Sequence, residues 1–233
     1  MMELTSRQIT LAIAFPIVIA IFIVLGILVL RKDSKYWGNR FFASFFWATA
    51  LTMVFNLLYL FSEDQPYIAV MNLLTAAMAV IGIIGLLLGI LVVYKSEDVI
   101  VNSYRVYLIL GVCIALIIVQ VAIPGAVYFD NPSSFDPRWS PTMGIYELLL
   151  SQALIIAVYY SSFQLYRELT SEMRTKFQKY LIGLAFLDLT FISVAIDNLN
   201  IFGDAYSLVG SALNFCVVIG ALLIYLGIVR RKT

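Results

Sequence analysis

Residues 74–93 read LTAAMAVIGIIGLLLGILVV, a run of twenty residues without a charged side chain. A helix needs roughly 20 mostly apolar residues to cross the hydrocarbon core of a bilayer. Because no water is present there to bond the backbone, a run of this length in lipid is helical. The stretch therefore predicts a transmembrane helix and places the chain among integral membrane proteins.

The rest of the chain has the same apolar character. Of its 233 residues, 62% are hydrophobic and 12% are charged, whereas a soluble domain has roughly 25% charged residues. We predict an all-α, multi-pass protein of the cell membrane, with seven spans in a single domain over residues 1–233. The predicted spans are residues 9–30, 41–62, 67–93, 106–129, 142–165, 178–200 and 206–229.

The distribution of lysine and arginine predicts the orientation of the bundle. Thirteen of these residues follow the first, third, fifth and seventh predicted spans, and only Arg7 and Arg138 lie on the other side. Basic loops stay in the cytoplasm. We therefore expect the N-terminus outside and the C-terminus in the cytoplasm, with Trp139 and Tyr146 near the outer membrane interface.

Two parts of the sequence show the same pattern. TALTMVFNLLYLFSE (49–63) and TFISVAIDNLNIFGD (190–204) place hydrogen-bonding residues at the same spacing, 141 residues apart. VIGIIGLLLGIL (80–91) and VIGALLIYLGIV (218–229) match at an offset of 138. An internal duplication would give two parallel three-helix halves linked by the fourth helix, a 3+1+3 plan. Alternatively, the two segments match only because amphipathic helices share one spacing.

This plan resembles a broad seven-helix superfamily that includes microbial rhodopsins, SWEET-type sugar transporters and the seven-helix sensor modules of some histidine kinases. The resemblance implies a seven-helix bundle. Rhodopsins hold retinal through a lysine of the seventh helix, whereas SLVGSALNFCVVIGALLIYLGIV (207–229) has none, and no predicted helix of the repeated pairs has a Pro-Gln motif. The chain also lacks histidine, so we expect neither retinal nor histidine-ligated haem, and the sensor modules are the nearest likeness.

Polar side chains on six predicted helices lie at one depth, in the outer half of the bundle. Thr190, Ser193 and Asp197 share one helix face, and a matching stripe follows Thr49 and Asn56. Because an unpaired polar group facing lipid is costly, these groups are expected to line an outward-facing cup. The candidate ligand-binding residues are Asn56, Tyr59, Asn72, Gln120, Glu147, Ser151, Gln152, Asp197, Asn200 and Asn214. Alternatively, they form interhelical hydrogen bonds worth about 0.6–2 kcal/mol each.

Charge and motifs restrict the function. The predicted outer side carries eight acidic residues and two basic residues. This excess of negative charge favours a neutral or cationic ligand. We predict a receptor-like sensor whose signalling partner docks at loops 31–40 and 167–179. The first alternative is a small-molecule or ion transporter in which Asp188, near mid-membrane, is the coupling residue. The second alternative is a membrane scaffold. No catalytic or metal-ligating motif is present, so we expect no enzymatic activity and no metal site. We also expect no nucleic-acid partner.

Overall fold

The structure is a computed structural model that describes residues 6–101, 104–130, 137–199 and 216–228. Its described helices are α1 (Ser6–Lys32), α2 (Trp37–Tyr59), α3 (Gln65–Lys95), α4 (Glu97–Ile100), α5 (Tyr104–Ala122), α6 (Pro141–Glu168), α7 (Ser171–Asn198) and α9 (Cys216–Ile228). Six of them, α1, α2, α3, α5, α6 and α7, are long and apolar enough to cross a membrane. The all-α class and the membrane-spanning character of the helices agree with the sequence prediction.

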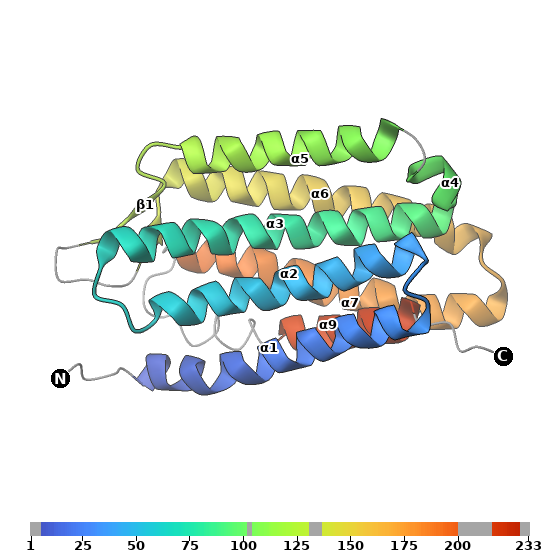
Figure 1. Cartoon of the computed structure of the whole chain (residues 1–233), viewed down its shortest axis with the longest axis horizontal. Coiled ribbons are helices and arrows are strands. Elements are labelled where there is room, and N and C mark those ends of the chain that lie inside the picture. Colours follow the sequence, from blue (N-terminus) through green and yellow to red (C-terminus); the bar gives the residue numbers. More distant parts are fainter. Residues whose placement is uncertain (1–5, 102–103, 131–136, 200–215, 229–233) are drawn as a thin grey trace.

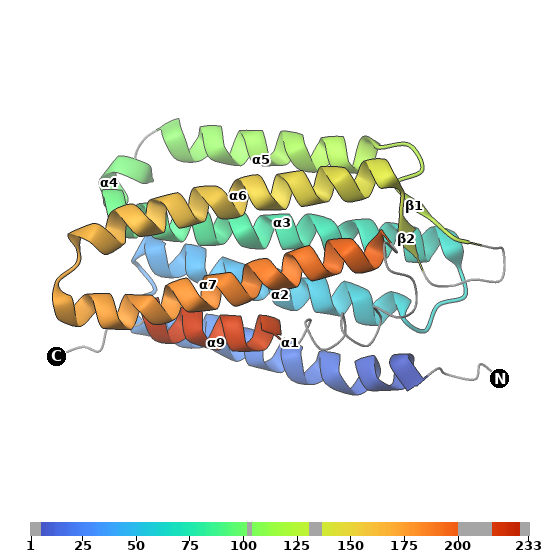
Figure 2. The same ribbon diagram turned by 180° about the vertical axis from the view of Figure 1, so that it is seen from behind.

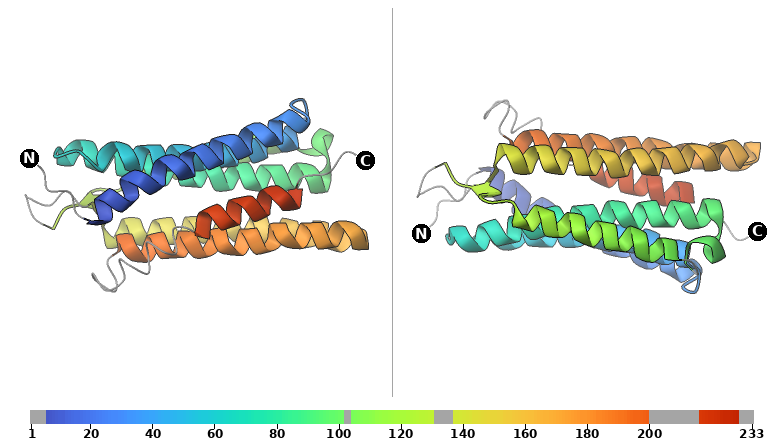
Figure 3. Two further views of the ribbon diagram at one scale, coloured as in Figure 1. Left: turned by 90° about the horizontal axis from the view of Figure 1, so that it is seen from below. Right: turned by 90° about the horizontal axis from the view of Figure 1, so that it is seen from above.

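The long helices run alternately in opposite directions and form one elongated bundle (Figure 1). α2 packs against α1 and α3, and α7 packs against α9 and α6, while α3 and α6 join the two groups. Figure 3 shows α1, α2 and α3 on one side and α6, α7 and α9 on the other. α5 lies at the edge of the bundle, where it contacts α3 and α6, as the view from behind shows (Figure 2).

One predicted boundary was wrong at the end of α5. The predicted span 106–129 continues too far, because the helix ends at Ala122, before Pro124 and before Gly125 with its φ of +61°. Proline has no N–H to continue the helix. The chain then forms a short antiparallel hairpin, β1 (Val127–Tyr128) with β2 (Arg138–Trp139).

The helix ends far from this hairpin include the start of α2 and the connection between α6 and α7. α6 extends to Glu168 and α7 begins at Ser171, so the charged segment 167–179 is helical except at Leu169 and Thr170. The first turn of α2 has no side-chain cap from Tyr36. Instead, the backbone N–H of Trp37 donates to Oε2 of Glu97, 60 residues later, at 3.2 Å.

The basic residues gather at one end of this bundle. The α1–α2, α3–α5 and α6–α7 connections lie together there (Figure 1). The basic residues at or beside these connections are Arg31, Lys32, Lys35, Arg40, Lys95, Arg105, Arg167, Arg174, Lys176 and Lys179. We call this the basic end, and the end with the α2–α3 connection and the hairpin the opposite end.

A tightly packed apolar core fills the bundle from its middle toward the basic end. It includes Phe22 of α1, Phe45 and Phe46 of α2, and Tyr180 of α7, each with an exposed fraction of 0%. Ring contacts such as Phe45–Phe46, with centroids 5.0 Å apart, fill this region with aromatic side chains. Burial of such rings is a large stabilising contribution. The remaining interior space therefore lies in the other half.

Candidate functional site

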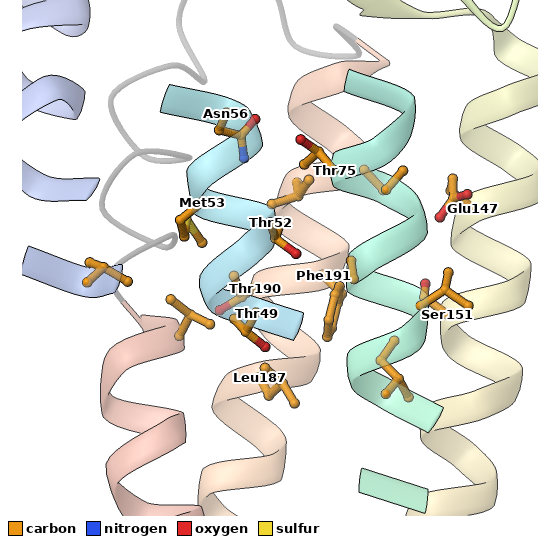
Figure 4. A pocket seen from close by; sticks show the side chains of 18 of the residues that line it. Thr49, Thr52, Met53, Asn56, Thr75, Glu147, Ser151, Leu187, Thr190 and Phe191 are labelled. Carbon is orange, nitrogen blue, oxygen red and sulfur yellow. The ribbon is translucent and has the colours of Figure 1, made fainter. Parts of the chain in front are cut away.

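A cavity of about 150 Å³ lies between the helices in the half nearer the opposite end. Its lining comes from α1, α2, α3, α6, α7 and α9, together with Trp139 of β2. Figure 4 shows labelled lining side chains arriving from α2, α3, α6 and α7. The cavity is therefore a shared interior space and not a gap between two neighbouring helices.

Threonines supply much of the polar lining. Thr49 and Thr52 of α2 donate their hydroxyl protons to the carbonyls of Phe45 and Ala48, at 2.9 and 3.0 Å. Thr75 of α3 and Thr190 of α7 do the same toward the carbonyl four residues earlier, both at 2.9 Å. These bonds satisfy the hydroxyl protons within each helix, which leaves oxygen lone pairs of Thr49, Thr52 and Thr75 for the cavity.

Asn56 lines the cavity one turn beyond Thr52, near the end of α2 (Figure 4). Its side-chain oxygen accepts a hydrogen bond from the hydroxyl of Tyr59 at 2.8 Å. Tyr59 itself is not among the lining residues. The tyrosine thus orients the amide of Asn56, and the amide nitrogen of Asn56 can donate toward the cavity.

Among the described residues that line the cavity, Glu147 is the one with a carboxylate. Its side chain comes from α6, and the residue is only 6% exposed. Its Oε1 atom is buried and has no hydrogen-bond partner among the described residues. Ser151, one turn further along α6, also lines the cavity and donates its hydroxyl proton to the Leu148 carbonyl at 3.1 Å.

The structure thus brings Asn56, Glu147 and Ser151 of the predicted site together. Another predicted residue bonds to the hairpin instead. Asn72 of α3 accepts a hydrogen bond from the indole N–H of Trp139 at 2.7 Å, and both side chains are buried. Trp139 is 6% exposed and packs into the bundle. Its depth near the outer membrane interface stays a prediction.

The remaining predicted residues do not line the cavity within the described chain. Gln120 is fully buried on α5, and neither amide atom has a partner among the described residues. Asp197, in the last turn of α7, is half-buried and outside the lining. Asn200 and Asn214 lie outside the described residues.

Asp188 makes a contact that the sequence did not predict. Its Oδ1 accepts a hydrogen bond from the side-chain amide of Gln152, at 2.8 Å, between α7 and α6. The nearby Tyr160 is 67% exposed. Neither Asp188 nor Gln152 lines the cavity.

Sequence reasoning missed the apolar lining and under-weighted the threonines. Phe191 and Leu187 of α7 face the cavity beside Thr190 (Figure 4). Thr49, Thr52 and Thr190 were recognised as a stripe but were not chosen as site residues. Their spacing of three or four residues was the available signal, whereas nothing in an apolar sequence distinguishes a cavity-lining leucine from a core leucine.

Comparison with models of known protein families, with curated proteins and with solved structures gives no match. In the described parts of the chain, no three His, Cys, Asp or Glu side chains gather as a metal site would require. The cavity therefore has to be interpreted from its own chemistry. It offers an apolar wall, hydroxyl and amide oxygens, and one buried carboxylate.

Proposed function

We propose that the protein is a seven-helix membrane sensor that binds a small neutral or cationic ligand in this cavity. One observation carries the proposal: six helices and the hairpin line a single space that holds the buried Glu147. Ligand pockets are mostly apolar and have a few placed polar groups. A ligand there would contact helices from both groups of the bundle at once.

A ligand can shift the arrangement of the helices only if it binds one arrangement more tightly than another. The cavity separates α2 and α3 from α7 and α9, so a ligand that fits it favours one spacing of the two groups. The same helices continue to the basic end, where loops 31–40 and 167–179 join them to their neighbours. These loops are the proposed docking region for a signalling partner.

The proposed topology has seven crossings, with the N-terminus outside. α9 is apolar but only 13 residues long over its described part, Cys216–Ile228. We propose that it is the described portion of the seventh span, because it continues the alternation of helix directions (Figure 1). The gathering of basic residues at one end supports a cytoplasmic position for that end.

A 3+1+3 duplication is part of the proposal, and two equivalent contacts support it. Thr49 and Thr190, 141 residues apart, both line the cavity and both donate to the carbonyl of a phenylalanine four residues earlier. Gly82 of α3 lies against α2, and Gly220 of α9 lies against α7, at an offset of 138. The pairs α2–α3 and α7–α9 would thus be the repeated units.

The test fills the cavity without changing charge. Ala79 lines the cavity on α3, so Ala79→Leu adds three carbons to that space. Ala115 is exposed on α5, so Ala115→Leu is the matched control. Purified proteins in detergent or nanodiscs are screened with a library of small neutral and cationic compounds by thermal shift and native mass spectrometry.

We expect ligands that stabilise the unmodified protein and the Ala115→Leu variant but not Ala79→Leu. A library in which compounds stabilise all three proteins equally would contradict a ligand site in the cavity. Substrate-dependent flux in proteoliposomes, lost in Asp188→Asn, would instead favour the transporter alternative. Copurification of a stoichiometric membrane partner, without any ligand response, would favour the scaffold.

A further inference from the structure

We propose that the ligand is a small organic amine, bound as its ammonium ion, whose N–H groups donate to Glu147. This inference rests on the proposed ligand site and names the class of compound that the site selects. Three features of the cavity carry it: the supply of donors and acceptors, the burial of Glu147, and the size and apolar character of the walls.

The lining is rich in acceptors and poor in donors. The hydroxyl protons of the four lining threonines and of Ser151 are used by backbone carbonyls of their own helices. The indole N–H of Trp139 is used by Asn72. No lysine, arginine or histidine is among the lining residues. Apart from the side-chain amide of Asn56, the described lining therefore offers acceptors only, so a ligand that bonds to it has to bring its own donors, as an ammonium group does.

Glu147 presents the acceptor that most needs such a donor. Its Oε1 atom is buried without a partner among the described residues. Burying an ionised carboxylate without a compensating partner costs several kcal/mol. An ammonium ion removes that cost and forms a charge-assisted hydrogen bond, which is stronger than a bond between neutral groups. A neutral alcohol supplies only one donor and no charge.

The apolar walls restrict the size and the polarity of the rest of the ligand. Val18, Ile83, Leu187, Phe191 and Val217 line the space from four helices. An apolar cavity of roughly 150 Å³ in another protein is large enough to bind benzene. The cavity here has about that volume, so the amine should carry one apolar body no larger than a single six-membered ring with a short arm. Benzylamine, protonated at neutral pH, has this size.

The experiment compares three probes of the same shape: benzylamine, benzyl alcohol and benzoate. Binding to the full-length protein in nanodiscs is measured by isothermal titration calorimetry and thermal shift, at fixed pH and salt. The variants are Glu147→Gln and, as a matched control on the same helix, Glu168→Gln, whose side chain is exposed at the basic end. Both remove one negative charge from α6, but only the first changes the cavity.

We expect the unmodified protein to prefer benzylamine to benzyl alcohol and to show no binding of benzoate. Hydrogen bonds to charged groups contribute about 1.5–3 kcal/mol, so Glu147→Gln should weaken benzylamine binding by roughly 10- to 100-fold. Glu168→Gln should leave it unchanged. The preference among probes is measured on the unmodified protein, and so it holds even if Glu147→Gln misfolds.

Each outcome decides a separate question. Equal binding of benzylamine and benzyl alcohol, abolished by Ala79→Leu, would overturn the amine and keep the ligand site. Benzylamine binding that Glu147→Gln leaves intact would also overturn the inference, because the carboxylate would not be its partner. No binding of any probe to the unmodified protein would overturn it too. The library screen on Ala79→Leu then decides independently whether the cavity binds ligands at all.

Discussion

Individual polar side chains divide into those that join elements and those that line the cavity. Asn72 and Trp139 join α3 to the hairpin, and Gln152 and Asp188 join α6 to α7. Each pair satisfies a side-chain group that would otherwise be buried or half-buried without a partner. Glu147 differs, because its Oε1 has no partner among the described residues. Both amide atoms of Gln120 also have no partner among the described residues, but Gln120 does not line the cavity, so Glu147 is the candidate for contact with the proposed ligand.

The Asn72–Trp139 hydrogen bond leads to a stability prediction. Asn72→Leu removes the acceptor and leaves a buried indole N–H without a partner. We expect a loss of about 1–3 kcal/mol in the free energy of unfolding, measured by denaturant unfolding in detergent. Trp139→Phe in the Asn72→Leu background removes the unpaired donor, so its additional cost should be smaller than that of Trp139→Phe alone. Strict additivity of the two substitutions would contradict the contact.

Asp188 leads to a second prediction at this scale. Asp188→Asn keeps an oxygen that can accept from Gln152, whereas Asp188→Leu removes it. We expect the first change to leave the unfolding midpoint nearly unchanged and the second to cost about 1 kcal/mol, the usual value of an interhelical hydrogen bond in a membrane. Ligand binding in the cavity should survive Asp188→Asn. Loss of ligand binding in that variant would tie Asp188 to the site.

At the scale of helices, close approach of α7 and α9 depends on a pair of glycines. A Cβ on Gly220 would lie 2.8 Å from the carbonyl oxygen of Gly183, and a Cβ on Gly183 would lie 2.6 Å from that of Gly220. Both distances are shorter than any carbon–oxygen contact a packed interior tolerates. The two helices therefore need both positions to lack a side chain.

The matched prediction compares two Gly→Ala changes inside helices. Gly220→Ala forces α9 away from α7 and should destabilise the protein by about 1–3 kcal/mol, the usual cost of overpacking. Gly111 of α5 has no heavy atom within 4 Å of an added Cβ, so Gly111→Ala should be neutral or stabilising by up to about 1 kcal/mol. Thermal unfolding of both variants in detergent is the measurement. A cost at Gly111 equal to that at Gly220 would contradict the packing.

Most helices could be predicted from the sequence because apolar length alone specifies a membrane span. The predicted spans 41–62 and 67–93 correspond to α2 and α3 within a few residues at each end. The end of α5 could have been placed from Pro124 and Gly125, which follow Ala122 closely in the sequence. The two-residue strands could not be predicted, because they pair across the loop between them and leave no periodic pattern in the sequence.

For the whole molecule, charge asymmetry predicts how the bundle sits in the membrane. All the described basic residues except Arg7 and Arg138 gather at one end (Figure 1). Single cysteines at exposed Ser34, in the α1–α2 connection, and at exposed Glu63, in the α2–α3 connection, test this in a variant whose native cysteines, Cys113 and Cys216, are replaced by alanine. In intact cells, a membrane-impermeant maleimide should label Glu63→Cys and not Ser34→Cys. The reverse pattern would invert the proposed orientation.

The site could be predicted only in outline at this scale. Depth along each span follows from position in the sequence, and so it was foreseeable that Asn56 and Glu147 lie in the same half of the bundle. Rotation of one helix against another does not follow from a single sequence. The sequence therefore could not show that Asn72 faces Trp139, or that Gln120 is buried away from the cavity. Ligand binding by Asn56, Glu147 and Ser151 stays a prediction.

The acceptor that Glu97 provides for the first turn of α2 has a consequence for biosynthesis. Trp37 leaves the ribosome sixty residues before the carboxylate that its N–H will meet. The start of α2 therefore cannot be completed while α2 alone enters the bilayer. It is completed when α3 has crossed back and Glu97 reaches the same side, so α2 and α3 should become stable in the membrane together, as one inserted hairpin.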